Sequence, residues 1–321
     1  MGNEPTKPSV PDGTTAQYRS HATPPDSGTF RQIAAFAAGA PFTALVAAVE
    51  VTVVTVALGV PLSTAPVAVG LVAFAVYAAD HVADAEGDAG STPTRARIAL
   101  RYADQLMVAA AVSYGLAVAL AAGAGPAALA LVLVPGAVWI GYATDWLPAA
   151  GDLVAPLGEV SVPRLKDVFL LNSAAVALAW AVAVVAAPLA FAGVPVDSIG
   201  TPAVGLLFAY VFARSFVDVE VPNVRDVAAD AAQGVATLPV VYGVTGTRRI
   251  LFAVDAVAVG LLAAIAATGA ASPAALAALG VGLAVSVAVT ALADRLRGAA
   301  LGVAPDCSYL VAGVVLLAIG L

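Results

Sequence analysis

The chain has 321 residues, of which 61% are hydrophobic and only 11% are charged, and its mean hydropathy is +0.96. A soluble domain usually carries charge on about a quarter of its residues, so this composition excludes a soluble globular domain and predicts a polytopic membrane protein. The net charge of −7 excludes a nucleic-acid-binding surface, which would have to be basic.

The predicted elements begin with a polar tail. Residues 1–30 are rich in Pro, Thr, Ser and Gly, and we expect them to be a disordered cytoplasmic tail before one membrane domain over residues 31–321. A helix that spans a bilayer needs about 20 mostly apolar residues. Nine windows satisfy this length, which predicts an all-α bundle of about nine transmembrane helices in the cell membrane. They are 38–60, 64–83, 101–122, 125–146, 168–190, 201–217, 248–268, 272–292 and 306–321.

Basic residues are segregated between the predicted loops. The turns near 61–63, 123–124, 191–200 and 269–271 carry no Lys or Arg. All 14 basic residues fall on the other side: Lys7, Arg19, Arg31, Arg95, Arg97, Arg101, Arg164, Lys166, Arg214, Arg225, Arg248, Arg249, Arg295 and Arg297. The positive-inside rule then predicts a cytoplasmic N-terminus and an external C-terminus.

Two acidic clusters interrupt the apolar chain, and both follow a predicted span on the cytoplasmic side. The first covers residues 80–88 and contains Asp80, His81, Asp84, Glu86 and Asp88, and the second covers residues 223–230 and contains Asn223, Arg225, Asp226 and Asp230. Aspartates four residues apart lie on one face of a helix, so each cluster points several carboxylates the same way. Acidic side chains at a membrane edge are costly and are kept mainly where they have a function.

This pattern predicts metal-assisted diphosphate chemistry. Mg²⁺ prefers oxygen ligands and usually takes one or two carboxylates together with substrate phosphates. A diphosphate leaves readily only when its charge is neutralised, and carboxylate-bound Mg²⁺ with nearby Arg or Lys can do this. If the diphosphate is attached to an allylic carbon, its departure leaves a stabilised cation that must be kept away from water. A lipid-facing bundle of apolar helices would provide that dry chamber and would admit an isoprenoid chain.

Several motifs resemble those of the UbiA-type intramembrane prenyltransferases, over about residues 35–321. The residues Gly234, Thr237, Leu238 and Pro239 match the Gly-x-x-Thr-Leu-Pro segment that follows the second acidic motif of that family. Arg164, Leu165 and Lys166 match its Leu-Lys pair before the fifth helix. The first motif departs from the family, because Asp80 and His81 replace its leading Asn-Asp, and Asn223 replaces the leading Asp of the second motif.

The resemblance implies roles for particular residues. Asp80, Asp84 and Asp88 would hold one Mg²⁺, and Asp226 and Asp230 would hold the other with help from Asn223. Asp84, Asp226 and Lys166 would be catalytic, while Arg225, and less directly Arg95, would contact the diphosphate. The implied activity is transfer of an isoprenyl group, such as geranylgeranyl, from its diphosphate to a lipophilic acceptor. The acceptor would be a quinone precursor, an ether lipid or a carotenoid.

Two alternatives stay open at the level of sequence. The altered first motif permits a family member that binds isoprenoids without catalysis. A membrane transporter is less consistent with the pattern, because its acidic residues would be expected near the bilayer midplane and not at one edge. Glu50 and Asp255 are intramembrane acids that would line the chamber or, more simply, pack through hydrogen bonds. Glu86 and Glu220 are expected to face solvent.

Overall fold

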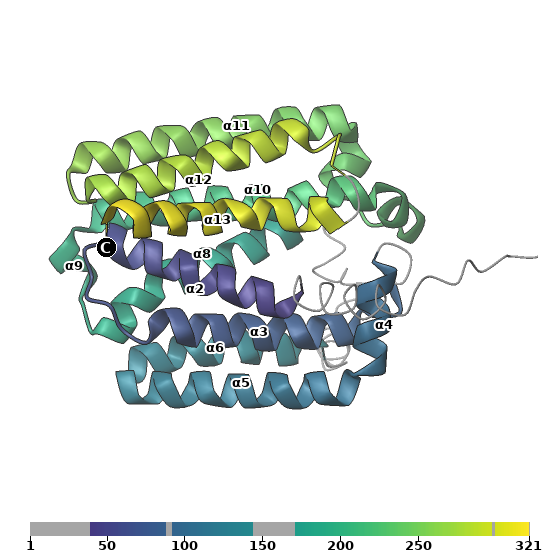
Figure 1. Cartoon of the computed structure of the whole chain (residues 1–321), viewed down its shortest axis with the longest axis horizontal. Helices are drawn as coiled ribbons and strands as arrows, with labels where there is room; N and C mark the ends of the chain where they lie inside the picture. The colour runs from purple at the N-terminus through teal and green to yellow at the C-terminus, as the bar shows by residue number, and fades with distance from the viewer. Residues whose placement is uncertain (1–38, 88–91, 144–170, 297–298, 321) are drawn as a thin grey trace, which may run out of the picture.

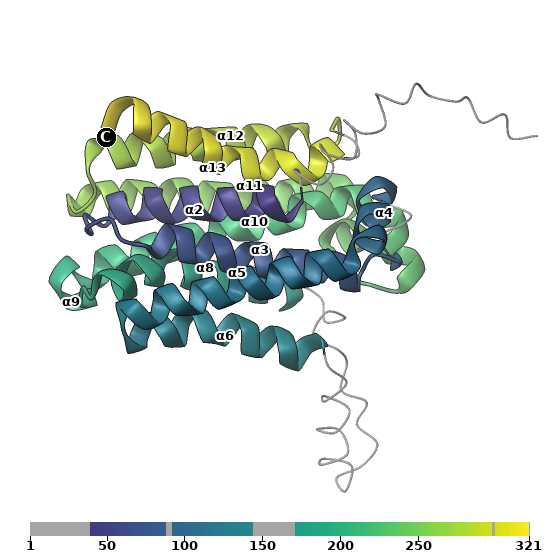
Figure 2. The ribbon, with the colours of Figure 1, turned by 60° about the horizontal axis from the view of Figure 1, so that its bottom comes forward.

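The computed structural model describes residues 39–87, 92–143, 171–296 and 299–320, and every regular element within these ranges is a helix (Figure 1). The long helices run side by side along the longest axis of the molecule in both views (Figure 2). In chain order they are α2 (Ala40–Ala57), α3 (Ala65–Ala83), α5 (Ala103–Ala124), α6 (Pro126–Ala143), α8 (Leu171–Ala192), α10 (Thr201–Gln233), α11 (Leu238–Thr268), α12 (Pro273–Leu292) and α13 (Ala299–Gly320). Two shorter helices, α4 (Pro93–Arg101) and α9 (Val196–Ile199), lie at opposite ends of the bundle.

Each of the nine windows expected from the sequence overlaps one of these long helices, although α10 continues beyond its window and α11 and α13 begin before theirs. Among the described residues, seven of them are long and apolar enough to cross a bilayer, namely α2, α3, α5, α8, α11, α12 and α13. The other two expected spans correspond to α6 and to the first half of α10. The chain is therefore a multi-pass membrane protein, and its predicted 1–30 tail lies outside the described residues.

Local sequence explains where the helices begin and end. α2, α3, α4, α10, α11 and α12 each have proline at one of their first two positions, where a missing backbone N–H costs no helical hydrogen bond. Ser272 caps α12, since its hydroxyl accepts a hydrogen bond from the backbone N–H of Ala275 at 3.2 Å. Gly234 ends α10 with φ of 73°, a left-handed conformation that favours glycine.

α10 extends well beyond the span expected from hydropathy. The segment 218–247, between the expected spans 201–217 and 248–268, is mostly helical, because α10 continues to Gln233 and α11 starts at Leu238. The extension is stabilised by packing, since Val217 and Val221 join Leu238, Leu251 and other apolar residues in a separate small core. A helical extension carries the second acidic cluster on a rigid element and not on a loop.

The main core lies between the helices and is made of small and branched side chains. Fully buried residues such as Val51, Ala68, Val184 and Leu316 represent it. α2 contacts α3, α8, α12 and α13, so this first helix lies among elements from both halves of the chain. The N-terminal and C-terminal halves are therefore joined through α2.

A pair of adjacent leucines on α13 tests this packing. Leu316 is 1% exposed in the core, and its neighbour Leu317 is 64% exposed on the outer surface. We expect Leu316→Ala to lower the free energy of unfolding by about 2–4 kcal/mol, because it leaves a cavity. Leu317→Ala should change it by less than about 1 kcal/mol, because that side chain contacts lipid before and after unfolding. Titration with SDS followed by circular dichroism measures both, and equal losses would contradict the assignment of the core.

Candidate active site

The first acidic cluster lies at the C-terminal end of α3. Asp80 is in the last turn and Asp84 follows directly as the helix cap, with its backbone N–H donating to the carbonyl of Asp80 at 2.9 Å. Both side chains are exposed, and their spacing of four residues places them on one face. Below them, Ala85 packs with Ala99 of α4 and Leu106 of α5, which fixes α4 beside the cluster. Asp88 lies outside the described residues.

The second acidic cluster lies on the last three turns of α10. The guanidinium of Arg225 donates two hydrogen bonds to the carboxylate of Asp226, at 2.8 Å from Nε and 2.6 Å from Nη2. Gly302 of α13 makes room for this arginine, because a Cβ at that position would lie 2.8 Å from Arg225 Nη1. Asp226 therefore has a positively charged partner that a diphosphate could also bind.

Asp230 ties the second cluster to the start of α11. The hydroxyl of Thr237 donates a hydrogen bond to Asp230 Oδ2 at 3.1 Å. Burial raises the pKa of Asp230 above its ordinary value, and the hydrogen bond from Thr237 offsets part of that rise. This contact gives a physical role to the threonine of the Gly-x-x-Thr-Leu-Pro segment: it orients a carboxylate.

Both clusters lie at the same end of the bundle. The end of α10 and the short helix α4 beside the end of α3 lie together, opposite α9 and the C-terminus (Figure 1). α8 contacts both α3 and α10 and so connects the two sides.

The carboxylates of the two acidic clusters are suitable ligands for Mg²⁺. Each cluster offers two described carboxylates four residues apart, and Mg²⁺ usually takes one or two carboxylates with substrate phosphates completing its shell. Within the described ranges, no three His, Cys, Asp or Glu side chains gather closely enough to hold a metal by themselves. The phosphate oxygens would therefore have to supply part of the coordination.

A buried polar network fills the interior beneath the clusters. Arg214 of α10 is 2% exposed, lies 3.6 Å from Asp218, and donates to the hydroxyls of Ser286 of α12 and Ser308 of α13, the latter at 2.7 Å. The hydroxyl of Tyr309 donates to Asp218, and its ring lies 5.3 Å below the Arg214 guanidinium. The network joins three helices inside an otherwise apolar bundle.

A second polar group lies on α2. Trp180 of α8 donates its indole N–H to Glu50 at 2.6 Å, and Glu50 is 4% exposed. The Tyr77 ring makes edge contacts with Trp180 and His81 at centroid distances of 6.4 and 6.3 Å. A continuous row of polar and aromatic side chains therefore leads from the interior to the first acidic cluster.

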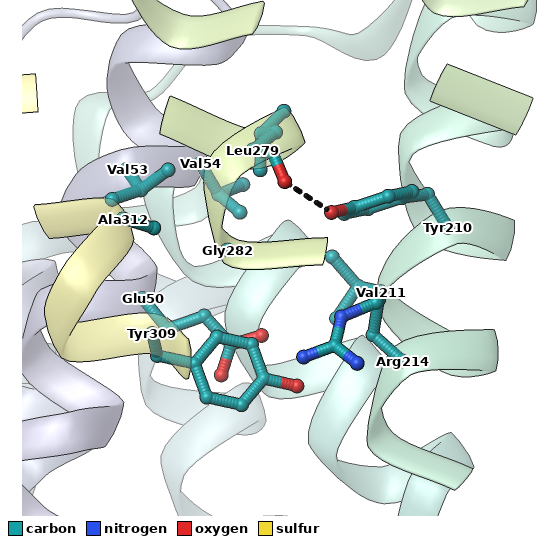
Figure 3. Close-up of a pocket in the computed structure, with 10 residues that line it drawn as sticks. All are labelled: Glu50, Val53, Val54, Tyr210, Val211, Arg214, Leu279, Gly282, Tyr309 and Ala312. Atoms are coloured by element: carbon teal, nitrogen blue, oxygen red, sulfur yellow. Dashed lines mark hydrogen bonds between the residues drawn. The ribbon is translucent and has the colours of Figure 1, made fainter. Parts of the chain in front are cut away.

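A small cavity lies between α2, α10, α12 and α13. Its volume is about 20 Å³, and Glu50, Tyr210, Arg214 and Tyr309 supply its polar lining (Figure 3). The carboxylate of Glu50, the guanidinium of Arg214 and the hydroxyl of Tyr309 point toward one another. The hydroxyl of Tyr210 points away from them and donates to the carbonyl of Leu279 at 2.9 Å.

The residues expected from the sequence divide into three groups. The structure places Asp80, Asp84, Arg95, Asn223, Arg225, Asp226 and Asp230 at one end of the bundle, whereas Asp88 and Lys166 lie outside the described residues. The expectation that Glu220 faces solvent is wrong, because it is 1% exposed and accepts a hydrogen bond from Asn223 at 3.0 Å. Its packing on the inner face of the α10 extension explains the difference.

Sequence reasoning missed most of the interior network. The positive-inside pattern groups Arg214 with the loop residues, but it lies buried within the bundle, and its partners Asp218 and Tyr309 belong to no sequence motif. The available signal was the spacing of Arg214 and Asp218, an opposite-charge pair four residues apart in an apolar segment.

Comparison with known proteins identifies the family. The model of the UbiA prenyltransferase family matches residues 33–302. No protein of curated function matches the chain.

Solved structures of low sequence identity share the fold. An apo UbiA homolog from Aeropyrum pernix K1 is 18% identical, covers 87% of this chain and 98% of its own, and superposes with a TM-score of 0.66. A UbiA homolog from Archaeoglobus fulgidus bound to DMAPP and Mg²⁺ is 15% identical, covers 88% of this chain and 99% of its own, and has a TM-score of 0.54. A structure described for digeranylgeranylglyceryl phosphate synthase is 14% identical over 90% of this chain and 97% of its own, with a TM-score of 0.50.

The buried pair of Arg214 and Asp218 leads to a prediction about the free energy of unfolding. We expect Arg214→Met to lower the free energy of unfolding by about 3–5 kcal/mol, because it leaves Asp218 buried without its charge partner. Replacing both partners, as Arg214→Met with Asp218→Leu, should recover most of that loss. The more exposed pair Arg248–Asp294, at 2.9 Å, is the control. Arg248 also donates to the carbonyl of Ala291 at 2.7 Å, and we expect Arg248→Met to cost about 1 kcal/mol, well below the loss in Arg214→Met. SDS unfolding measures all three, and a double variant no more stable than Arg214→Met would contradict this account.

Proposed function

The chain belongs to the UbiA prenyltransferase family, and from this premise we propose that it is an Mg²⁺-dependent enzyme that transfers an isoprenyl group. The donor is an isoprenyl diphosphate, and the acceptor is a lipophilic molecule from the bilayer. The observation that carries the proposal is that the two acidic clusters, on the ends of α3 and α10, lie at the same end of the bundle (Figure 1). The relative from Archaeoglobus fulgidus that binds DMAPP and Mg²⁺ supports this choice of donor and metal.

The residues at this end have separate tasks in the proposal. Asp80, Asp84 and Asp88 would hold one Mg²⁺, and Asp226 and Asp230 the other, with Asn223 beside them. When bound, the metal ions neutralise the diphosphate and so allow the allylic carbon–oxygen bond to break.

Basic side chains would assist the departure of the diphosphate. Arg225 already binds a carboxylate through two parallel hydrogen bonds, and the same fork geometry suits a phosphate. Lys166, and Arg95 on α4, would add positive charge. The apolar helices around the chamber would keep water away from the cation.

The positions of the carboxylates argue for function over stability. A helix C-terminus carries a partial negative charge, so each acid in a last turn costs about 0.3–1 kcal/mol in unfavourable electrostatics. Asp80 and Asp84 end α3, and Asp230 lies in the last turn of α10. Residues that lower helix stability at two separate helix ends are best explained by a ligand that they bind.

Substitution of single aspartates in the two clusters tests the proposed prenyl transfer. We expect Asp84→Asn and Asp226→Asn each to lower prenyl transfer by at least about 100-fold, because each removes a negatively charged Mg²⁺ ligand. EDTA should abolish turnover in the unaltered protein, and excess Mg²⁺ should restore it. The measurement is incorporation of label from tritiated geranylgeranyl diphosphate into membrane lipids.

The matched control is Asp197→Asn, an exposed acid on α9 at the opposite end of the bundle. It should leave the rate unchanged. Full activity in either cluster variant would refute the assignment of the site.

The clusters would face the cytoplasm. The Lys and Arg residues are all predicted to lie on that side of the membrane, and the four turns on the opposite side contain no Lys or Arg. In a background with Cys307→Ser, we expect Asp197→Cys to react with a membrane-impermeant maleimide on intact cells. Arg295→Cys, exposed beyond α12, should react only in inverted vesicles. The reverse labelling pattern would invert the proposed orientation.

A further inference from the structure

One wall of the second acidic cluster is provided by a helix that carries neither cluster. Gly302 lies in the first turn of α13, and a Cβ at this position would lie 2.8 Å from Nη1 of Arg225 and 4.0 Å from its Cζ. Apart from its chain neighbours and the backbone of α13, the described residues place no other atom within 4 Å of that Cβ. The guanidinium of Arg225 therefore takes the space that a side chain at position 302 would fill.

The guanidinium of Arg225 is held from two sides. Its Nε and Nη2 donate to the carboxylate of Asp226 at 2.8 and 2.6 Å, which is already at the short end of the range for hydrogen bonds between charged groups. Its Nη1 lies on the opposite edge of the planar group, against Gly302. Because both edges are in contact, a side chain at position 302 would push the guanidinium out of this place.

The geometry of α10 alone does not explain this position. Adjacent residues of a helix point in directions about 100° apart and do not face each other, so Arg225 has to bend along the helix to reach Asp226. The backbone of α13 beside it is held by packing, because Leu301 is 1% exposed in the small core that contains Val217 of α10. A methyl group at position 302 would therefore be accommodated by movement of the arginine and not of α13.

We propose that Gly302 is a positioning residue for the diphosphate of the isoprenyl donor, because its missing side chain keeps the Arg225 guanidinium beside Asp226. The inference rests on the proposed function and adds α13 as a third wall of the site, next to the ends of α3 and α10. A phosphate oxygen accepts a hydrogen bond from a guanidinium only when the two atoms are about 3 Å apart. Displacement of the guanidinium by a methyl group removes that contact.

The experiment measures binding of a donor analogue to the purified full chain in detergent. The probe is geranylgeranyl thiolodiphosphate with Mg²⁺ present, and calorimetry gives its dissociation constant. We expect Gly302→Ala to raise this constant about 10-fold, the effect of losing one hydrogen bond between charged groups. The midpoint of its unfolding in SDS should not fall, because alanine favours a helix more than glycine does and its Cβ meets only the flexible end of Arg225.

A double-mutant cycle shows whether Gly302 acts through Arg225. Arg225→Ala should itself raise the dissociation constant of the analogue by at least about 10-fold, because the guanidinium is lost. In that background the arginine no longer fills the space beside position 302, so the addition of Gly302→Ala should cause no further loss of affinity. Additive losses would mean that the glycine affects the site by another route, and they would overturn the proposal.

Gly313→Ala is the matched control for a steric disturbance in the same helix. A Cβ at this position would meet the side chain of Val49 of α2, and Gly313 lies about 16 Å further along α13 than Gly302, toward the C-terminus. We expect this variant to lower the midpoint of unfolding in SDS, because its methyl group overfills the core. The dissociation constant of the analogue should stay unchanged.

The remaining outcomes separate this inference from the proposed function. Unchanged affinity in Gly302→Ala, or an equal loss of affinity in Gly313→Ala, would overturn the role of Gly302 while leaving the enzyme assignment intact. If the unaltered chain does not bind the analogue in the presence of Mg²⁺, the proposed function fails, and this inference fails with it.

Discussion

The interior of this bundle depends on one buried cation, Arg214, and on the polar side chains that bind it among apolar helices. Arg214 is 2% exposed, yet its guanidinium donates hydrogen bonds to the hydroxyls of Ser286 and Ser308 and lies 3.6 Å from the carboxylate of Asp218. Removal of an ion from water is costly unless the protein replaces the lost hydrogen bonds. The network therefore permits polar side chains to lie where a prenyl chain could reach them, without opening the bundle to water.

The cost of burying charge also explains how the acidic residues are divided between the interior and the end of the bundle that carries the acidic clusters. Carboxylates at the end, such as Asp84 and Asp226, are reachable by solvent and by metal ions, whereas Glu50 is reachable only from within the helices. The acids at the end of the bundle would meet the charged leaving group of the proposed reaction. Glu50 is instead held inside the bundle, where its carboxyl accepts a hydrogen bond from the indole N–H of Trp180.

Much of this arrangement could be predicted from the sequence, and the remainder could not for physical reasons. The apolar windows located the nine long helices of the described residues, because a bilayer imposes a minimum length on any spanning segment. The spacing of Asp80 with Asp84 and of Asp226 with Asp230 was sufficient to identify both clusters. The partners of Arg214 could not be predicted from the sequence, because Ser286 and Ser308 are more than 70 residues away in the chain and have no distinguishing local pattern. The burial of Glu220 also depends on tertiary packing, which hydropathy alone does not encode.

The glycine at position 302 has a consequence for how α10 and α13 move. Arg225 of α10 lies against Gly302, where a larger residue would meet its guanidinium, and two hydrogen bonds join the same helices, from Arg214 to Ser308 and from Tyr309 to Asp218. Sliding one helix past the other by a single turn, about 5.4 Å, would break both hydrogen bonds. These two bonds therefore favour a single register of α10 against α13.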